Sequence, residues 1–380
     1  EELKAMGVKM GTPKFKINEE IKNGTITAFS SNYELYGELH NRLMHTLSRF
    51  TPDIEIYSID ESWLLFENFN YNMPDYAEHI VAETFKLVGI PISLGIAPTK
   101  TLAKVANKLA KKNPESKGAK VLQTPDEIKA ALSVFPVQDL WGVGRSKFKA
   151  LTQLNIKTAL EFSQLPGGWV KKNFSITGFR TWQELRGFPC HQLLEETSSK
   201  DAIATGRTFG NLLTDYDSIK EALVNHAVSC SQKLRKQKSY ASYVNIRIET
   251  NRFRDDLPRY VNTSTVRLLQ PTNSAVLIAK ATIEAFDKIF KKGIFYNRCS
   301  VTLLGLSDEL TGMQESLFEQ HDRAKSNTLM TVLDQVNIKY GKNTLKIATQ
   351  GTGKTWALRN QHQSPKYLTQ LDDFIKVILG

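Results

Sequence analysis

The sequence predicts a multidomain α+β protein, and three features of the chain support this fold class. Its 380 residues exceed the size of one average hydrophobic core, so two to four domains are expected. Strand and helix patterns alternate through about the first 120 residues, which is typical of a sheet domain. Residues 121–197 instead contain short helical patterns interrupted by Gly and Pro. Beyond them, residues 205–310 show the order β-α-β-β-α-β, the split βαβ arrangement on a four-stranded sheet.

The composition excludes several protein classes. Hydrophobic residues make up 41% of the chain and charged residues 23%, which are ordinary globular values and exclude a disordered chain. No apolar run approaches the roughly 20 residues that span a bilayer, so no membrane association is expected. The three cysteines form no CxxC pair, and neither a zinc site nor a disulfide framework is indicated. We therefore expect a cytoplasmic protein in a reducing compartment.

The positive charge is concentrated in one part of the chain. The formal net charge is +11, and residues 205–310 hold 16 Lys and Arg against 10 Asp and Glu, whereas residues 1–120 are balanced. Such an excess is typical of a surface that binds a polyanion. The charge distribution alone is equally consistent with a soluble basic protein that binds no polyanion.

The N-terminal region begins with an amphipathic helix. Leucines recur every four residues from Leu35 to Leu47, which predicts a helix over residues 31–49 with Ser31 as its N-cap. A second helix is expected over about 76–88.

A buried strand and a basic helix follow. The stretch PISLGIA (91–97) predicts the strand, and TKTLAKVANKLAKK (99–112) predicts the helix. Leu102, Val105, Ala106 and Leu109 mark the inward face of this helix. Its lysines Lys100, Lys104, Lys108 and Lys111 lie on a different face.

Two adjacent carboxylates interrupt an apolar stretch at YSIDESWLLF, residues 57–66. Residues before and after Asp60 and Glu61 predict two short strands that meet at this point as a β-hairpin. Neighbouring residues at a hairpin turn can both face an open edge, unlike neighbours within a strand. Two carboxylates placed in this way could bind Mg²⁺, which prefers oxygen ligands and often shares them with phosphates. The alternative is an acidic, solvated turn.

A glycine-containing turn precedes a basic helix in the stretch LWGVGRSKFKALTQLNIKTALEFSQLP, residues 140–166. Gly142 and Gly144 would let backbone N–H groups approach a DNA phosphate at a helix N-terminus, as in a helix-hairpin-helix. Such binding is independent of base sequence because only the DNA backbone is contacted. The counter-charges would come from Arg145, Lys147 and Lys149. The alternative is an ordinary tight turn between helices.

The last 70 or so residues are less periodic, and we expect them to form an appended tail. The stretch MQESLFEQ contains Gln314, Leu317 and Phe318, whose apolar side chains in a polar context are typical of a docking peptide. A satellite packing contact would explain the same pattern.

The stretch QGTGKTW (350–356) resembles a phosphate-binding P-loop that contains Lys354. However, Ala348 occupies the position of the first glycine of that motif. We therefore expect a glycine-rich turn near the surface instead of an NTPase site.

Together, the SIDE hairpin, GIAPTKTLAKVANKLAKK, the GVGR turn and the βαββαβ module resemble the Y-family translesion DNA polymerases over essentially the whole chain. This resemblance implies a right-hand polymerase with palm, fingers, a small helical thumb containing a helix-hairpin-helix, and a little finger. The implied domains are partial fingers (1–31), palm (32–120), thumb (121–197), linker (198–204), little finger (205–310) and a C-terminal tail with a clamp-binding motif (311–380).

The resemblance also implies the activity and its residues. The expected reaction is error-prone, template-directed DNA synthesis past damaged bases in the SOS response. Asp60 and Glu61 would be catalytic and hold Mg²⁺, with Glu61 supporting the primer-side ion. The other implied site residues are Lys111 for the nucleotide; Gly142, Gly144, Arg145 and Arg207 for DNA; and Gln314, Leu317 and Phe318 for the sliding clamp.

The family further implies several partners. They are primer-template DNA, deoxynucleoside triphosphates, the sliding clamp, the processed UmuD dimer and the RecA filament.

The chain departs from the family pattern at its start. The family's palm begins with a strand that carries another metal-binding Asp and an aromatic steric gate, and this chain starts after both. We therefore expect it, as numbered here, to bind DNA and to polymerise weakly or not at all. The alternative function is a non-catalytic DNA- and sliding-clamp-binding protein.

Overall fold

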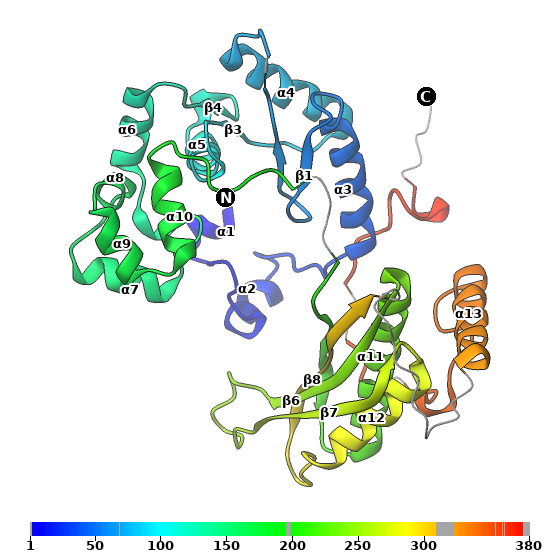
Figure 1. Cartoon of the computed structure of the whole chain (residues 1–380). Helices are drawn as coiled ribbons and strands as arrows, with labels where there is room; N and C mark the ends of the chain where they lie inside the picture. The colour runs from blue at the N-terminus through cyan, green and yellow to red at the C-terminus, as the bar shows by residue number, and fades with distance from the viewer. Residues whose placement is uncertain are drawn as a thin grey trace. The chain divides into compact units, whose positions relative to one another are not determined.

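The computed structural model describes residues 2–67, 69–194, 199–308, 323–353, 355–358, 360 and 362–374. Within it the chain forms two compact units (Figure 1). The N-terminal unit comprises residues 1–197 together with 362–380, and the sheet unit comprises residues 198–361. The predicted docking residues Gln314, Leu317 and Phe318 lie outside the described residues, as does Lys354. No helix in the described ranges is both long enough and apolar enough to cross a membrane.

The N-terminal unit contains two short β-ladders and a series of helices. The antiparallel ladder joins β1 (Ile54–Ile56) to β2 (Ser62–Leu64), and the parallel ladder joins β3 (Leu94–Ile96) to β4 (Ala119–Val121). The helices up to β4 are α1 (Glu2–Ala5), η1 (Lys14–Ile17), α2 (Asn18–Lys22), α3 (Tyr33–Leu47), α4 (Met73–Val88), α5 (Lys100–Lys112) and η2 (Pro114–Ser116). Those after β4 are α6 (Pro125–Val134), η3 (Val137–Asp139), α7 (Arg145–Gln153), α8 (Ala159–Ser163), α9 (Gly167–Asn173) and α10 (Ile176–Leu185), with η5 (Leu371–Asp373) near the C-terminus.

The predicted N-cap of the helix after residue 30 is wrong by one position. Asn32, not Ser31, caps α3, because its side-chain oxygen accepts a hydrogen bond from the backbone N–H of Leu35 at 3.3 Å. The Asn32 amide also donates to the carbonyl of Ser364 at 3.2 Å, and the side chain is buried. The cap therefore also anchors a segment more than 300 residues away.

Two clusters of apolar side chains hold the N-terminal unit together. In the first, α3 and α4 pack against both ladders through Leu47, Ile80, Ile54 and Leu94. In the second, the inward face of α5 packs with α6 to α10. As predicted, Leu102, Val105 and Ala106 are buried there, whereas Leu109 is partly buried.

The sheet unit confirms the predicted β-α-β-β-α-β order. Its elements are β5 (Ile203–Leu213), α11 (Tyr216–Gln237), β6 (Ser239–Thr250), β7 (Val261–Thr272), α12 (Ala275–Asp287) and β8 (Tyr296–Asp308). The strands pair in the order β5-β8-β6-β7, and every pair is antiparallel. Helices α11 and α12 cover one face of this sheet (Figure 1). Alternate residues of β6, namely Val244, Ile246 and Ile248, are fully buried beneath them.

The prediction of an appended tail is wrong for residues 323–340. These residues form α13 (Arg323–Tyr340), in which Met330 and Leu333 are buried. Met330 belongs to an apolar cluster with residues of α11 and α12. Both carboxylate oxygens of Asp334 accept hydrogen bonds from Arg235 on α11, at 2.6 and 2.8 Å. Only a few positions of α13 are buried apolar residues, so its sequence lacks a regular apolar stripe of helical period.

The stretch that resembles a P-loop packs against α11 through its glycines. Gly351 has a φ of +61°, and a Cβ there would lie 2.6 Å from Oε1 of Glu221. A Cβ on Gly353 would lie 2.7 Å from Oε2 of the same residue. Gln350, which ends η4 (Ala348–Gln350), is buried and exchanges hydrogen bonds with Asn225. The expected glycine-rich turn is present, but its first residue is buried, and its glycines allow close approach to a carboxylate.

A buried histidine on α11 makes the stability of the sheet unit depend on pH. His226 is 4% exposed, and its ring lies against that of Trp356. Burial, reinforced by nearby Arg207 and Lys233, lowers the pKa of His226 from 6.5 to about 4. Below pH 6.5 the unfolded chain therefore binds a proton that the folded chain does not, and stability falls as the pH decreases from 6.5 towards 4. We expect a loss of about 2 kcal/mol in the free energy of unfolding between pH 7 and pH 5 from this residue.

Urea unfolding of His226→Leu at the two pH values checks this expectation. The variant should lose that part of the pH dependence, whereas His45→Gln, a change at an exposed histidine of α3, should keep it. An unchanged pH dependence in His226→Leu would contradict the assignment.

The two glycines before α7 differ in what a methyl group would meet. Gly142 has a φ of +85°, and a Cβ there would lie 3.0 Å from Oγ1 of Thr181. Gly144 has a φ of −85° and no atom within 4 Å of the Cβ position. We expect Gly142→Ala to lower the free energy of unfolding by about 1–2 kcal/mol, because an L-residue is strained at positive φ. Gly144→Ala is the matched control and should change thermal stability little. Equal destabilisation by both changes would contradict this difference.

Candidate functional site

The two carboxylates lie at the turn of the β1–β2 hairpin, as predicted. Ile56 pairs with Ser62 at the end of the ladder, and the backbone N–H groups of Tyr57 and Ser58 both donate to the carbonyl of Glu61. This closed turn leaves the side chains of Asp60 and Glu61 exposed. The Ser58 hydroxyl donates to Oδ1 of Asp60 at 2.6 Å and orients that carboxylate.

The donor set fits a hard divalent cation in type. Asp60 and Glu61 offer carboxylate oxygens on adjacent, exposed side chains, which is the ligand chemistry that Mg²⁺ and similar ions prefer. No group of three or more His, Cys, Asp or Glu residues suited to a metal occurs among the described residues. The hairpin therefore offers two candidate ligands, and an ion bound there would complete its coordination with water or with phosphate oxygens.

Helix α5 reaches this hairpin through its row of lysines. Three of them, spaced four residues apart, pair with acids from three other segments: Lys100 with Glu55, Lys104 with Glu61 at 3.0 Å, and Lys108 with Asp139 at 3.0 Å. Lys111 differs from them, because it is exposed and no ion pair within the described residues involves it. The sequence predicted a lysine face, but not that most of it would form ion pairs.

Three aromatic rings surround the ammonium group of Lys104. Its Nζ lies 4.8 Å from the ring centroid of Tyr57, 5.4 Å from that of Trp63 and 5.5 Å from that of Trp141. The indole N–H of Trp141 donates to the Tyr57 hydroxyl at 3.3 Å. We call these three residues the aromatic box. Sequence reasoning missed it, although a tryptophan beside each of two quoted motifs, SIDES and GVGR, was a usable signal.

The GVG turn presents a helix N-terminus with a basic first residue. Gly144 is the N-cap of α7, no side chain caps that end, and Arg145 is exposed. The element before the turn is the short η3. Lys147 is predicted to supply counter-charge to a phosphate, but its ammonium donates to the carbonyl of Gly142 at 2.9 Å and to Thr177 Oγ1 at 3.1 Å. Burial lowers the pKa of Lys147, which fits this internal position.

In the sheet unit, Arg207 lies on the helix-covered side of the edge strand β5. It pairs with the buried Cys299 and lies on the same side of the strand as Ile203 and Phe209, which are also buried, yet its own side chain is exposed at the sheet edge. The opposite face of the sheet carries other arginines, since Arg247 alternates with the buried residues of β6.

The register places two further arginines on the open face. Arg298 pairs with Glu249, and Arg267 pairs with Tyr243. Arg247 donates to the Glu249 carboxylate at 2.7 Å, and Arg298 lies 3.8 Å from it. Arginines therefore outnumber acids on this part of the face. Sequence reasoning selected Arg207 but missed these three.

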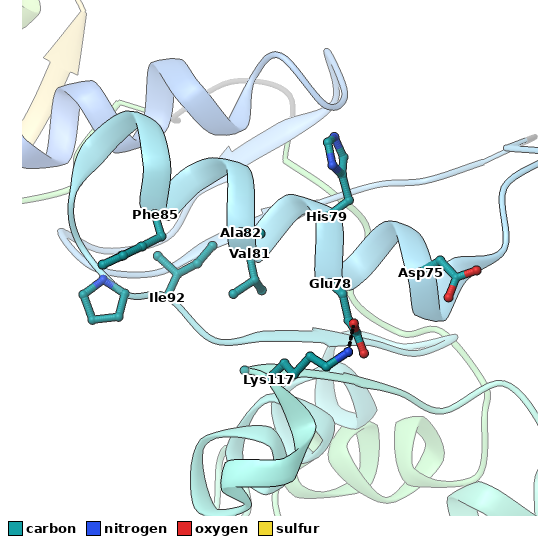
Figure 2. A pocket seen from close by; sticks show the side chains of 10 residues that line it. Asp75, Glu78, His79, Val81, Ala82, Phe85, Ile92 and Lys117 are labelled. Carbon is teal, nitrogen blue, oxygen red and sulfur yellow. Dashed lines mark hydrogen bonds and ion pairs between the residues drawn. The ribbon is translucent and has the colours of Figure 1, made fainter.

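A hollow of about 690 Å³ lies elsewhere in the N-terminal unit, along α4 (Figure 2). Val81, Phe85 and Ile92 supply apolar walls, and an ion pair between Lys117 and Glu78 spans one side. None of the predicted site residues lines it, so this hollow is not the candidate active site.

Comparison with known protein families divides the chain into three matched segments. The impB/mucB/samB family matches residues 1–108, and the impB/mucB/samB family C-terminal domain matches residues 200–317. A domain of unknown function, DUF4113, matches residues 327–377.

Curated relatives match nearly the whole chain. Protein UmuC of Salmonella typhimurium is 37% identical over 380 residues, which cover 99% of this chain and 90% of that protein. Protein ImpB of Salmonella typhimurium is 33% identical, with 100% and 90% covered. DNA polymerase IV of Clostridium acetobutylicum is 27% identical, with 90% and 83% covered.

A solved structure shows the same fold. A Y-family DNA polymerase chimera of Dbh and Dpo4 aligns with a TM-score of 0.61 at 17% identity, covering 81% of this chain and 86% of that one. The predicted right-hand polymerase fold is thereby confirmed. Y-family DNA polymerases, to which the curated relatives belong, are nucleotidyltransferases that generally use divalent metal ions. The chain therefore belongs to the impB/mucB/samB family of Y-family DNA polymerases, together with UmuC.

Proposed function

We propose that this chain catalyses error-prone, template-directed DNA synthesis past damaged bases as part of the SOS DNA-damage response. The observation that carries the proposal is the pair of exposed carboxylates, Asp60 and Glu61, at a hairpin turn in a chain of this polymerase family. Relatives that match most of the chain include a named DNA polymerase, which favours catalysis over the non-catalytic DNA- and clamp-binding alternative.

The carboxylates are proposed to hold Mg²⁺. Asp60 and Glu61 would hold this ion, which would supply neutralisation of phosphate charge and assistance to attack on the α-phosphorus. The Ser58 hydroxyl orients the Asp60 carboxylate. Glu61 is proposed to support the ion on the primer side. Lys111, exposed near the C-terminal end of α5, is proposed to contact the incoming triphosphate. The carboxylates and this lysine would position the substrate for nucleotidyl transfer.

Two surfaces are proposed to hold primer-template DNA without reading its sequence. The backbone N–H groups that follow Gly142 and Gly144, with Arg145, suit a phosphate at the start of α7. In the sheet unit, the arginines of the open face, Arg247, Arg267 and Arg298, suit the DNA backbone. Arg207, exposed at the sheet edge on the other side, is proposed as a separate backbone contact. We assign residues 1–31 to the fingers, 32–120 to the palm, 121–197 to the thumb and 205–310 to the little finger.

A P-loop NTPase is not supported. The glycines of QGTG approach the carboxylate of Glu221, and a negatively charged neighbour repels phosphate. The turn thus has a packing explanation.

The proposed partners follow from the family and from one sequence motif. Gln314, Leu317 and Phe318 are proposed to dock on the sliding clamp, and the processed UmuD dimer and the RecA filament are proposed to recruit the polymerase. We propose a cytoplasmic location, because the DNA template lies there and because the three cysteines are free thiols, as in a reducing compartment.

Primer extension across an abasic site, with the intact gene product and Mg²⁺, tests the catalytic proposal. We expect Asp60→Asn to reduce extension at least 100-fold, because losing one electrostatic ligand raises the barrier by about 3–4 kcal/mol. DNA affinity should be unchanged. Asp75→Asn on α4 is the matched control and should extend normally. Extension by Asp60→Asn at the wild-type rate would refute the role of this carboxylate.

Clamp docking is tested by replacing Leu317 and Phe318 with Ala. These changes remove the apolar anchors of the proposed peptide, so binding to immobilised sliding clamp should be lost while DNA affinity is retained. If the double variant still binds the clamp as the wild type does, the peptide is not the docking site.

A further inference from the structure

Two different kinds of interaction stabilise the ammonium charge of Lys104. Its ammonium forms an ion pair with Oε1 of Glu61 at 3.0 Å and also lies inside the aromatic box of Tyr57, Trp63 and Trp141. The Lys104 side chain is only 22% exposed, whereas that of Glu61 is 51% exposed. The lysine is therefore the more enclosed partner, and the carboxylate is the more accessible one.

The box is built from two separate parts of the chain, the β1–β2 hairpin and the GVG turn, and its three rings contact one another. Tyr57 precedes the carboxylate turn, Trp63 lies on β2, and Trp141 begins the GVG turn. The three ring centroids lie 5.8–6.3 Å from one another. Ring faces attract a cation because of their negative quadrupole, and the attraction is stronger where water is excluded. Lys104 would thus stay in place without its ion pair.

An ammonium held in this way competes with any cation that binds Glu61. It lies where the carboxylate can contact it in the absence of metal, and its charge repels an arriving divalent ion. When the carboxylate turns towards such an ion, the box still holds the lysine beside the site.

We propose that Lys104 is a positioning residue for the metal ligand Glu61. Its boxed ammonium occupies the carboxylate when no divalent cation is bound, keeps it ordered, and raises the cation concentration needed for binding. This inference rests on the proposed metal role of Asp60 and Glu61.

A matched residue on the same helix provides the control. Lys108 follows one turn later, pairs with Asp139 at 3.0 Å and lies 5.8 Å from the ring centroid of Phe135. It therefore has the same kinds of contact as Lys104, but its carboxylate is not a proposed metal ligand.

The experiment measures Mn²⁺ binding to the complex of the intact polymerase with primer-template DNA, using electron paramagnetic resonance to count free Mn²⁺. Lys104→Met keeps the aliphatic length and removes the charge, and we expect it to bind Mn²⁺ at least threefold more tightly. Lys108→Met should bind as the wild type does, and Lys104→Arg, which keeps the charge, should restore near-wild-type affinity. Unchanged or weaker Mn²⁺ binding in Lys104→Met, with DNA affinity and thermal stability intact, would overturn the proposal.

A double-mutant cycle separates positioning from a general charge effect. In a Glu61→Gln background, Lys104→Met should no longer change Mn²⁺ affinity, because the effect passes through the carboxylate. The same gain in both backgrounds would overturn the proposal.

Asp60→Asn distinguishes the metal role of the carboxylates from the positioning role of Lys104. If this variant leaves Mn²⁺ binding intact, the proposed function fails. If it weakens binding and Lys104→Met has no effect, only the positioning role of Lys104 fails.

Discussion

The N-terminal unit depends on the hydrogen bonds that the buried carboxylate of Glu184, on α10, accepts at the start of α5. One of its oxygens accepts hydrogen bonds from the backbone N–H and the hydroxyl of Thr101, and the other accepts from the backbone N–H groups of Cys190 and His191. A carboxylate is favoured at a helix N-terminus, and here every hydrogen bond is charge-assisted. Leaving a buried member of such a network without its hydrogen-bond partner typically costs about 1–3 kcal/mol, and more for a charged group. Glu184 thus fixes the start of α5 against the segment that follows α10.

The direction of α5 in turn locates the functional side chains. Next to Thr101, Lys100 pairs with Glu55 of β1, and both side chains are nearly buried. Glu55 also accepts from the backbone N–H of Leu194, so this pair joins the strand, the helix and the end of the unit. One turn further along, Lys104 reaches the carboxylate hairpin. The residues of the PTKT stretch therefore have structural partners that explain their identity: a cap at Thr99, an ion pair at Lys100 and a buried anchor at Thr101.

Sequence reasoning succeeded where the information is local. Apolar flanks around Asp60 and Glu61 predicted the hairpin, and alternating periodicities predicted the order of strands and helices in the βαββαβ module, because both patterns extend over a few neighbouring positions. It failed where a partner is distant in the chain. The lysine at 104 meets a carboxylate 43 residues earlier and an indole 37 residues later, and no periodicity encodes such meetings. Arg207 shows a third limit, since its charge was visible but the side of the strand that carries it was not.

The C-terminal region is best understood as belonging to both units. The DUF4113 match covers residues 327–377. In the structure, α13 and the QGTG turn pack within the sheet unit, whereas residues 362–374 belong to the N-terminal unit. There the backbone of Ser30 donates to the carbonyl of His362, and Lys366 pairs with Glu34 in the first turn of α3. The described residues of this segment thus pack on the cores of the two units. Its sequence must satisfy two different packing surfaces, and polar anchors hold it at each of them: Arg235–Asp334 in the sheet unit and Asn32–Ser364 in the N-terminal unit.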